Sequence, residues 1–443
     1  MLTRAGGAGG AGGAGTADTA DTADTVDTAD NEPAGNAGGD GSTMSNSDLK
    51  VRLASAPPAA PAASAQPAIL GTYSIFPVRP VAGRGSWLID EAGNEWLDAY
   101  GGHAVSSTGH SHPAVVRAIS AQAERLLFYS TAVGHEARER LAEALVARVP
   151  APLAGVFFCN SGAEANENAL NLARKITGRE AVVSLEGGWH GRTAACLAVT
   201  DGAKYEEGAR RAGVPLSRKL PFNQLAGLEQ AINPTVAAVI LEPVQGMSGA
   251  RPVDLAFLRR IRDLCTEHGV VLIYDEVQCG VGRCGAFTAA ESYGIAPDIL
   301  TLAKGLASGL PIGATLVSAA IGEQVKSGDL GSTFGGGPVP CAAALATLEV
   351  IDAEGLIENA KAVGEHLTAG ARRIPGVTAV QGRGLLLGLR LTRPGAEVQQ
   401  ALIRRRILAG TASDPAILRL IPPLSFSRQE ADLLLAALGE ELA

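Results

Sequence analysis

The sequence predicts an α/β protein in which a large, doubly wound and mostly parallel sheet domain precedes a smaller α+β domain. Short apolar runs without polar alternation are typical of buried parallel strands, and helical periodicities fall between several of them. A chain of 443 residues with 46% hydrophobic side chains is long and apolar enough for more than one core.

The first 67 residues are predicted to lack a fold. Gly-Gly-Ala triplets run to Gly15, Thr-Ala-Asp triplets run to Asp30, and an Ala/Pro-rich linker ends at Pro67. Neither repeat holds enough apolar surface to offset the entropy of ordering, so we expect residues 1–67 to be a disordered tail and linker. Met44 follows the repeats and is a second candidate start.

Helical stripes and apolar runs predict the elements of the large domain. Apolar residues from Ala165 to Ile176 recur at helical spacing, and Gly178 closes that helix. Asp254 is placed to cap a second helix, which Gly269 ends. Buried parallel strands are expected at 156–159, 181–185, 236–241, 270–274 and 299–303.

The alternation of strands and helices places the large domain at residues 106–325. Residues 326–443 alternate helices with short strands such as 385–391, which predicts the smaller α+β domain. The segment 68–105 is expected to join that smaller domain.

Charge and apolar pattern exclude several classes of partner. Eight acidic residues and one basic residue fall within residues 1–48, so the net charge of −8 leaves the rest of the chain close to neutral. Broad binding to nucleic acid or to an anionic membrane is therefore not expected. No apolar run approaches the ~18 residues of a membrane span, and no secretory signal is recognised at the N-terminus.

The cysteines and histidines predict no metal site. None of the six cysteines forms a C-x-x-C pair, so we expect reduced, mostly buried thiols in a cytoplasmic protein. His110 and His112 have no accompanying ligand cluster and are expected in a loop before Pro113.

Two G-x-G-x-x-G matches do not predict a dinucleotide site. The match at 7–12 lies in the repeats, and the match at 280–285 is separated from its strand and opens no amphipathic helix. A dinucleotide fingerprint needs its glycines to start the helix that binds the pyrophosphate.

Residues 160–167 follow a predicted strand and open a well-patterned helix. Small residues at a helix N-terminus let free N–H groups approach a phosphate. Ser161 with Glu164 also fits a plain capping box, so this segment alone leaves both interpretations open.

Asp275 and Lys304 each follow an apolar run that predicts a strand. Ligands of α/β sheets bind at such strand ends. Poor solvation lowers the pKa of a lysine toward a nucleophilic amine. A carboxylate, a lysine and a phosphate cradle at one sheet edge are what pyridoxal phosphate requires, although either residue alone fits an ordinary ion pair.

The motifs around these residues resemble the class III aminotransferases, subgroup II, of the acetylornithine and ornithine type. The resemblance runs from about Tyr73 to the C-terminus and implies the fold type I architecture of pyridoxal-phosphate-dependent transferases. The motifs that carry it, around Lys304, are at 161–167, 189–193, 242–246, 275–278 and 332–336.

The resemblance implies roles for residues of the cofactor site. Lys304 would form the internal aldimine, Asp275 would hold the pyridine nitrogen, and Gln278 would donate to the phenolic oxygen. Thr333 would reach the phosphate in the partner subunit, which implies a homodimer. Trp189 stands where the family usually has Phe or Tyr stacked on the ring. The implied cofactor-binding residues are Gly162, Ala163, Trp189, Asp275, Val277, Gln278, Lys304 and Thr333.

Substrate contacts are implied at Arg192, Ser332 and Arg419. Planar guanidinium groups suit carboxylates. In ornithine-type relatives a glutamate after Gln-Gly masks the arginine that corresponds to Arg419, whereas Met247 stands at that position here. Glu242 either supports the pocket floor or masks Arg419 instead.

The implied activity moves a terminal amino group from N-acetylornithine or a close relative to 2-oxoglutarate, with ping-pong kinetics. Met247 and the sequence Gly336-Gly337-Pro338 depart from the family pattern near the substrate, so another ω-aminotransferase, with ornithine, 4-aminobutyrate or a lysine derivative as donor, remains the alternative. Two further hypotheses for the function remain, a different reaction on the same fold and a binding protein without catalytic activity.

Overall fold

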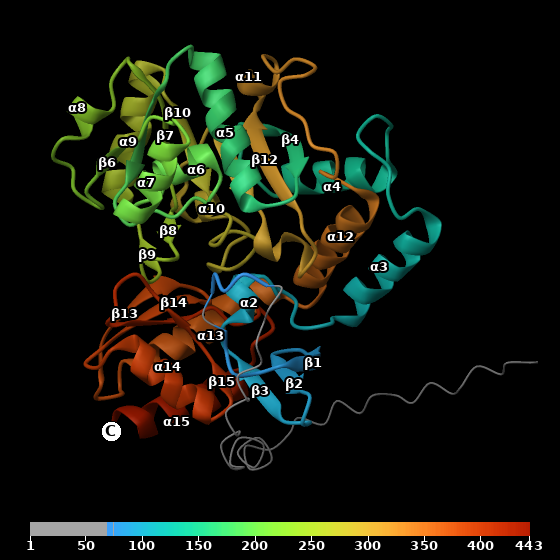
Figure 1. The fold of residues 1–443 in the computed structure, drawn as a ribbon, viewed down its shortest axis with the longest axis vertical. Coiled ribbons are helices and arrows are strands. Elements are labelled where there is room, and N and C mark those ends of the chain that lie inside the picture. Colours follow the sequence, from blue (N-terminus) through green and yellow to red (C-terminus); the bar gives the residue numbers. More distant parts are fainter. Residues whose placement is uncertain (1–68, 74) are drawn as a thin grey trace, which may run out of the picture. The chain divides into compact units, whose positions relative to one another are not determined.

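A computed structural model of the chain describes residues 69–73 and 75–443 (Figure 1). The predictions for residues 1–67, including the alternative start at Met44, lie outside the described residues. Within the described residues, no helix combines the length and apolar character needed to cross a membrane.

The largest sheet has seven strands in the order β4-β12-β11-β10-β7-β5-β6. β12 pairs antiparallel with both of its neighbours, and the other pairs in this sheet are parallel. All five predicted strands are present. The strands are β4 (Leu153–Cys159), β5 (Ala181–Leu185), β6 (Arg218–Leu220), β7 (Val236–Leu241), β10 (Val271–Asp275), β11 (Ile299–Leu302) and β12 (Gly313–Ser318).

The sequence predicts no strand at β12, because β12 is not joined to the preceding strand by the long helix of a βαβ unit. A parallel crossover usually carries a helix of a dozen or more residues. β11 and β12 are instead joined through the short 3₁₀ helix η1 (Lys304–Ala307), so the chain turns back antiparallel beside the strand it has just left.

Helices cover both faces of this sheet, as a doubly wound fold requires. Ile240 of β7 belongs to an apolar cluster with residues of α5 (Gly162–Thr177). Ala238, two residues earlier in the same strand, belongs to the same cluster and so faces the same side of the sheet. The adjacent Val239 belongs instead to the cluster that contains residues of α9 (Leu255–His268). The middle strands are therefore buried on both sides, which is why they read as continuous apolar runs.

The two predicted helices begin and end close to the expected residues. Ser161 caps α5 by accepting from the N–H of Glu164, and Gly178 ends it with φ of 66°. Asp254 is the N-cap residue of α9, as predicted, although its side chain makes no capping hydrogen bond. Gly269 ends α9 with φ of 60°.

Further helices surround the sheet or connect its strands. They are α3 (Pro113–Arg125), α4 (Glu136–Val146), α6 (Ala194–Val199), α7 (Ala203–Arg211), α8 (Leu228–Ala231), α10 (Ala289–Tyr293), α11 (Ala319–Gly322) and α12 (Pro338–Ala353). The helix α12 packs against α3 and α4, although it lies after the boundary at residue 325 that the sequence predicts for the large domain.

Two four-stranded sheets form the rest of the described chain, and Figure 1 shows the blue N-terminal elements beside the red C-terminal ones. One has the order β1-β2-β3-β15 and the other β13-β14-β17-β16. In the first, β15 pairs parallel with β3 from the opposite end of the described chain. The strands are β1 (Pro80–Arg84), β2 (Trp87–Asp90), β3 (Glu95–Asp98), β13 (Val377–Arg383), β14 (Leu386–Leu391), β15 (Ile407–Leu408), β16 (Gly410–Thr411) and β17 (Ile417–Leu420).

Helices complete this region. β14 corresponds to the strand predicted at 385–391. The helices are α2 (Gly101–Ala104), α13 (Leu356–Ala371), α14 (Gly395–Arg404) and α15 (Arg428–Leu442), and a two-stranded ribbon is formed by β8 (Val244–Gln245) and β9 (Arg251–Pro252).

Candidate active site

A cavity of about 340 Å³ opens at the C-terminal ends of β4, β10 and β11. The structure brings together here most of the residues predicted to bind a cofactor. Those that line the cavity are Gly162, Ala163, Trp189, Asp275, Val277, Gln278 and Lys304.

The N-terminus of α5 forms one wall of the cavity. Its first N–H groups have no acceptor within the helix, and the helix dipole makes this end favourable for an anion. A Cβ atom on Gly162 would lie 2.5 Å from Cγ1 of Val277, so only glycine fits between the helix end and the residue after β10. Ser161 caps the helix, but Glu164 accepts from the N–H of Asn160 and not from that of Ser161, so the reciprocal capping box is not formed. The helix N-terminus lines the cavity, and its binding of a phosphate stays a prediction.

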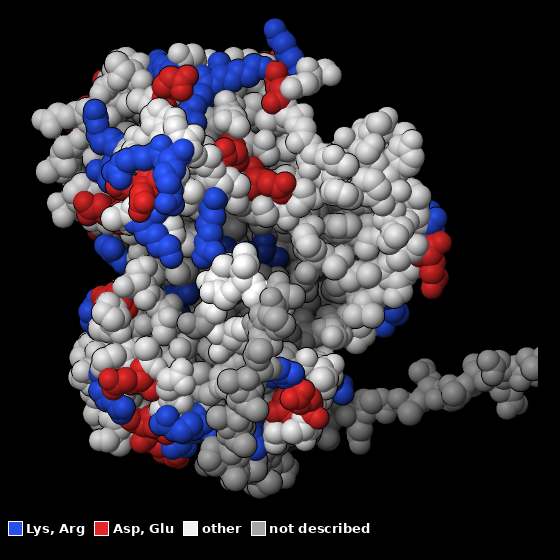
Figure 2. All heavy atoms as spheres, in the orientation of Figure 1, with Lys and Arg blue, Asp and Glu red and all other residues white. Residues whose placement is uncertain are grey.

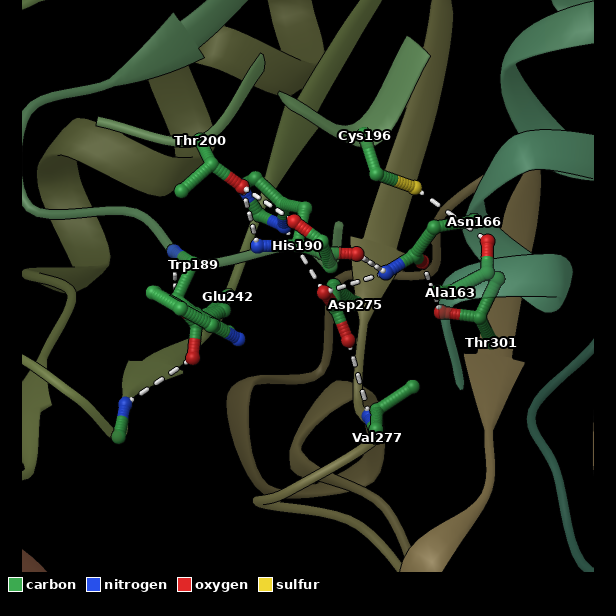
Figure 3. A network of polar contacts seen from close by, with 12 residues as sticks. Ala163, Asn166, Trp189, His190, Cys196, Thr200, Glu242, Asp275, Val277 and Thr301 are labelled. Carbon is green, nitrogen blue, oxygen red and sulfur yellow. Dashed lines mark hydrogen bonds and ion pairs between the residues drawn. The ribbon is translucent and has the colours of Figure 1, made fainter. Parts of the chain in front are cut away.

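The carboxylate of Asp275 is fixed by three N–H donors (Figure 3). Asn166 Nδ2 and His190 Nδ1 each lie 2.8 Å from Oδ2, and the N–H of Val277 lies 3.1 Å from Oδ1. Thr301 in turn donates to Oδ1 of Asn166 at 2.7 Å. Asp275 is buried. These three contacts fix the orientation of the buried carboxylate.

Asn166 and His190 are functional candidates that the sequence analysis does not single out. Each lies inside a motif quoted for the resemblance, at 161–167 and 189–193, and this membership is the signal that the sequence offers. His190 is fully buried, and its Nε2 has no hydrogen-bond partner. With no acceptor at Nε2, the bond to Asp275 selects the form of the ring that carries its proton on Nδ1.

The strand that precedes Lys304 ends one residue earlier than the sequence pattern predicts. β11 ends at Leu302, and Lys304 begins η1 with φ of 45°, a left-handed conformation. Burial lowers the pKa of its ammonium, while Asp275 and Glu242 act in the opposite direction. Among residues 69–73 and 75–443 this ammonium forms no hydrogen bond or ion pair, which leaves the amine accessible at the cavity.

Glu242 closes the floor of the cavity. Its two carboxylate oxygens accept from the N–H of Trp189 at 2.8 Å and from the N–H of Gly246 at 3.0 Å. Burial raises the pKa of Glu242 to about 7, partly opposed by His190. Glu242 therefore supports the loops that carry two neighbouring motifs, and it forms no ion pair with Arg419 in the described structure.

Arg192 lies outside this cavity, beside the aromatic residue predicted to stack on a cofactor. Its guanidinium carbon is 5.4 Å from the centre of the Trp189 ring and 5.2 Å from that of Tyr73. Its Nη1 also donates to the Tyr73 hydroxyl at 2.9 Å. Tyr205 meets the indole of Trp189 edge to face, with centroids 4.9 Å apart, and so orients it.

Arg419 on β17 is buried beside Gln278. Its Nε donates to the carbonyl of Thr411 at 2.6 Å, and Nη1 donates to that of Gly246 at 3.2 Å and to Oε1 of Gln278 at 3.4 Å. Among the described residues, no carboxylate lies within ion-pair distance of Arg419. It lines a second cavity of about 750 Å³, which Met247 links to the first because it lines both.

Ser332 and Thr333 lie outside both cavities. The hydroxyl of Ser332 accepts from Nδ2 of Asn160 at 3.2 Å and from the N–H of Gly335 at 3.0 Å. Thr333 is exposed. Its reach to the phosphate of a partner subunit stays a prediction.

On the face shown in Figure 2, acidic and basic side chains are interspersed, and a hollow near the middle has basic side chains in and beside it. The remaining histidine pair is explained locally, since His110 bonds to Asp98 and His112 to Glu354. All six cysteines are free and buried. No group of three or more potential metal ligands occurs in the part of the chain that the structure describes.

Comparison with known proteins decides the family. The sequence profile of "Aminotransferase class-III" matches residues 72–442. The chain belongs to the class III aminotransferases. It is 42% identical over 382 residues to acetylornithine aminotransferase 1 of Bordetella bronchiseptica, and the match covers 82% of this chain and 95% of that protein.

Solved structures agree with this membership and with the fold type I architecture. The ornithine aminotransferase of Toxoplasma gondii superposes with a TM-score of 0.78 at 30% identity, covering 84% of this chain and 92% of that one. The acetylornithine aminotransferase of Elizabethkingia anophelis gives a TM-score of 0.74 at 29% identity, covering 84% and 96%.

This aminotransferase depends on pyridoxal phosphate, as its family does. The residues present fit the group. The helix end beside Gly162 suits a phosphate, the oriented Asp275 carboxylate suits a protonated ring nitrogen, and Lys304 offers an amine without a competing partner among the described residues.

Proposed function

We propose that this aminotransferase moves the terminal amino group of N-acetylornithine, or of a close relative, to 2-oxoglutarate. The observation that carries the proposal is the position of Lys304 and Asp275 at one cavity in a chain 42% identical to an acetylornithine aminotransferase. Glutamate and the semialdehyde of the donor are the products, and one cofactor serves both half-reactions in turn.

The cofactor, when bound, supplies an electron sink for the carbon that carries the amine. The N-terminus of α5 at Gly162 and Ala163 binds the phosphate, Trp189 packs against the ring, and Gln278 donates to the phenolic oxygen. Asp275 holds the ring nitrogen protonated, and Asn166 and His190 keep its carboxylate in place. Val277 packs against Gly162 at the start of α5 and would contribute an apolar contact to the bound cofactor.

Lys304 holds the cofactor between reactions and serves as the base that moves the proton of the donor carbon. Burial lowers the pKa of Lys304, which favours the neutral amine that this task requires. Its backbone has a left-handed conformation at the start of η1, and its side chain lines the cavity.

Carboxylates of the substrates are bound by Arg192 and Arg419, with Ser332 as a further contact. Arg419 is buried without an acidic partner, so a substrate carboxylate would supply the missing counter-charge. Arg192 is exposed beside Tyr73 and Trp189.

The proposal includes a homodimer in the cytoplasm. Thr333 and Phe334 are exposed, and Phe334 packs at 5.1 Å between ring centroids against Phe128, so this loop offers an apolar surface for a partner. Six free thiols support a reducing compartment.

A donor panel tests the proposal. Each donor alone is added to the purified holoenzyme, and loss of the visible absorbance of the bound cofactor is followed. N-acetylornithine should react with a kcat/KM at least about tenfold above that of ornithine or 4-aminobutyrate, and 2-oxoglutarate should restore the absorbance. Faster reaction with ornithine would favour the alternative donor, in line with the ornithine aminotransferase from Toxoplasma gondii.

A further inference from the structure

The short helix α2 is a left-handed turn. Its four residues have φ between 56° and 69°, and two of them, His103 and Ala104, are not glycine. A left-handed conformation costs a non-glycine residue roughly 1–2 kcal/mol. Residues in such conformations cluster at functional sites, where the surrounding structure holds them.

The turn is fixed at both ends. Oδ1 of Asp98 accepts from the N–H groups of Tyr100 and Gly101 at 2.9 and 2.8 Å. The N–H of Ile421 donates to the carbonyl of Ala99 at 2.9 Å. Strand β3 and the segment after β17 therefore determine where the side chain of His103 points.

His103 is exposed at the 750 Å³ cavity, together with Tyr100 and Arg419. The Tyr100 hydroxyl lies 2.6 Å from Nδ1 of His103 and 3.2 Å from Nε2. The hydroxyl has one proton to donate, and Nδ1 is the nearer acceptor. A neutral ring anchored in this way carries its own proton on Nε2.

The charges around His103 favour the neutral ring. Burial lowers the pKa of His103, and the cations Arg419, Lys304 and Arg192 lower it further. No carboxylate among the described residues forms an ion pair with His103. Burial raises the pKa of Tyr100, so its hydroxyl keeps its proton.

We propose that His103, held by Tyr100, determines donor specificity by donating a hydrogen bond from Nε2 to the carbonyl oxygen of an N-acylated amino donor. This inference rests on the proposed function and names the group that distinguishes an acylated donor from a free diamine. An amide carbonyl accepts from Nε2–H, whereas an ammonium has only donors and meets a region that already holds the cations Arg419 and Arg192.

Two unreactive ligands test the inference without turnover. N-acetylnorvaline is N-acetylornithine without its terminal amine, and pentanoate also lacks the acetamido group. Their dissociation constants from the holoenzyme are measured by calorimetry, and their ratio reports recognition of the acetamido group. The wild type should bind N-acetylnorvaline more tightly, and His103→Gly should reduce that preference about 5- to 10-fold, as expected for one hydrogen bond.

His103→Gly suits the test because glycine adopts φ of 69° without strain. Gln400→Ala is the matched control, since Gln400 is exposed in the same cavity and should leave the ratio unchanged. Should His103→Gly fail to fold, Tyr100→Phe removes the anchoring hydroxyl and should reduce the preference at least about threefold.

The inference is overturned if the wild type shows no preference, or if the preference in the folded variant stays within twofold of the wild type. Turnover of N-acetylornithine is measured separately. A wild type that binds the acetamido group through His103 but does not turn the donor over would refute the proposed function and leave this inference standing.

Discussion

Replacing Met247 with glutamate should supply the buried Arg419 with the counter-charge that it lacks. Met247 lines both cavities, and Arg419 lines the larger one. The guanidinium has five N–H donors, and its described acceptors are three neutral oxygens, on Thr411, Gly246 and Gln278. Burial lowers the pKa of Arg419, which shows how unfavourable its isolated charge is. A carboxylate at position 247 is therefore expected to pair with it.

The expected magnitude follows from the loss of one charge-assisted contact to substrate. Such a contact is worth about 1.5–3 kcal/mol, which corresponds to roughly 10- to 150-fold in affinity. Met247→Glu should weaken glutamate and 2-oxoglutarate binding by this amount. The terminal-amine donor should be affected much less, if its carboxylate is bound by Arg192.

Each half-reaction is measured alone by following the visible absorbance of the bound cofactor after one substrate is added. Met247→Gln is the matched control, because glutamine has the same shape as glutamate without its charge. If a pair forms, the glutamate variant should also melt at a higher temperature than the glutamine variant. A glutamate half-reaction that is equal in the two variants would show that Arg419 does not bind the carboxylate.

Three further substitutions test the cofactor site. Lys304→Ala should retain pyridoxal phosphate through phosphate and ring contacts but lose nearly all turnover, and wild-type turnover would contradict its assignment. Asp275→Asn should slow proton abstraction by orders of magnitude in single-turnover experiments, and it should destabilise the fold by about 1–3 kcal/mol because an amide cannot accept all three N–H donors now bound. Glu242 has a pKa raised from 4.5 to about 7, so its contribution to stability is full below pH 4.5 and is lost as the pH rises through 7. Glu242→Gln should remove this fall, which is up to about 3 kcal/mol, from the free energy of unfolding measured by denaturant between pH 4.5 and 8, and an unchanged pH profile would mean that Glu242 does not titrate in this range.

The cofactor side of the site could be predicted because it depends on strand ends. Asp275 and Lys304 follow apolar runs whose parallel arrangement brings their C-terminal ends to one edge, so local pattern was sufficient to bring them together. Asn166 and His190 could not be found in this way, because their bonds to Asp275 join segments that are distant in sequence and carry no periodic signal.

The larger cavity, where His103 and Arg419 lie, was harder to predict from the sequence than the cofactor site. The left-handed turn at His103 and Ala104 has no sequence signature beyond its two preceding glycines, since residues other than glycine uncommonly adopt this conformation. The resemblance pointed to Arg419, but only the structure shows that no carboxylate among the described residues pairs with it.

The pairing of β3 with β15 has a consequence for the order in which a growing chain can assemble its site. The residues that line the cavity around Asp275 and Lys304 all precede Ser318, so all of them have been synthesised before residues 319–443 are added. The turn at His103 has no such early support, because it depends on the backbone of Ile421 and on the neighbouring Arg419. A nascent chain can therefore build the half that carries the cofactor before the half that selects the donor. Domains generally fold as they emerge, so the region that determines specificity is completed in the last stage of synthesis.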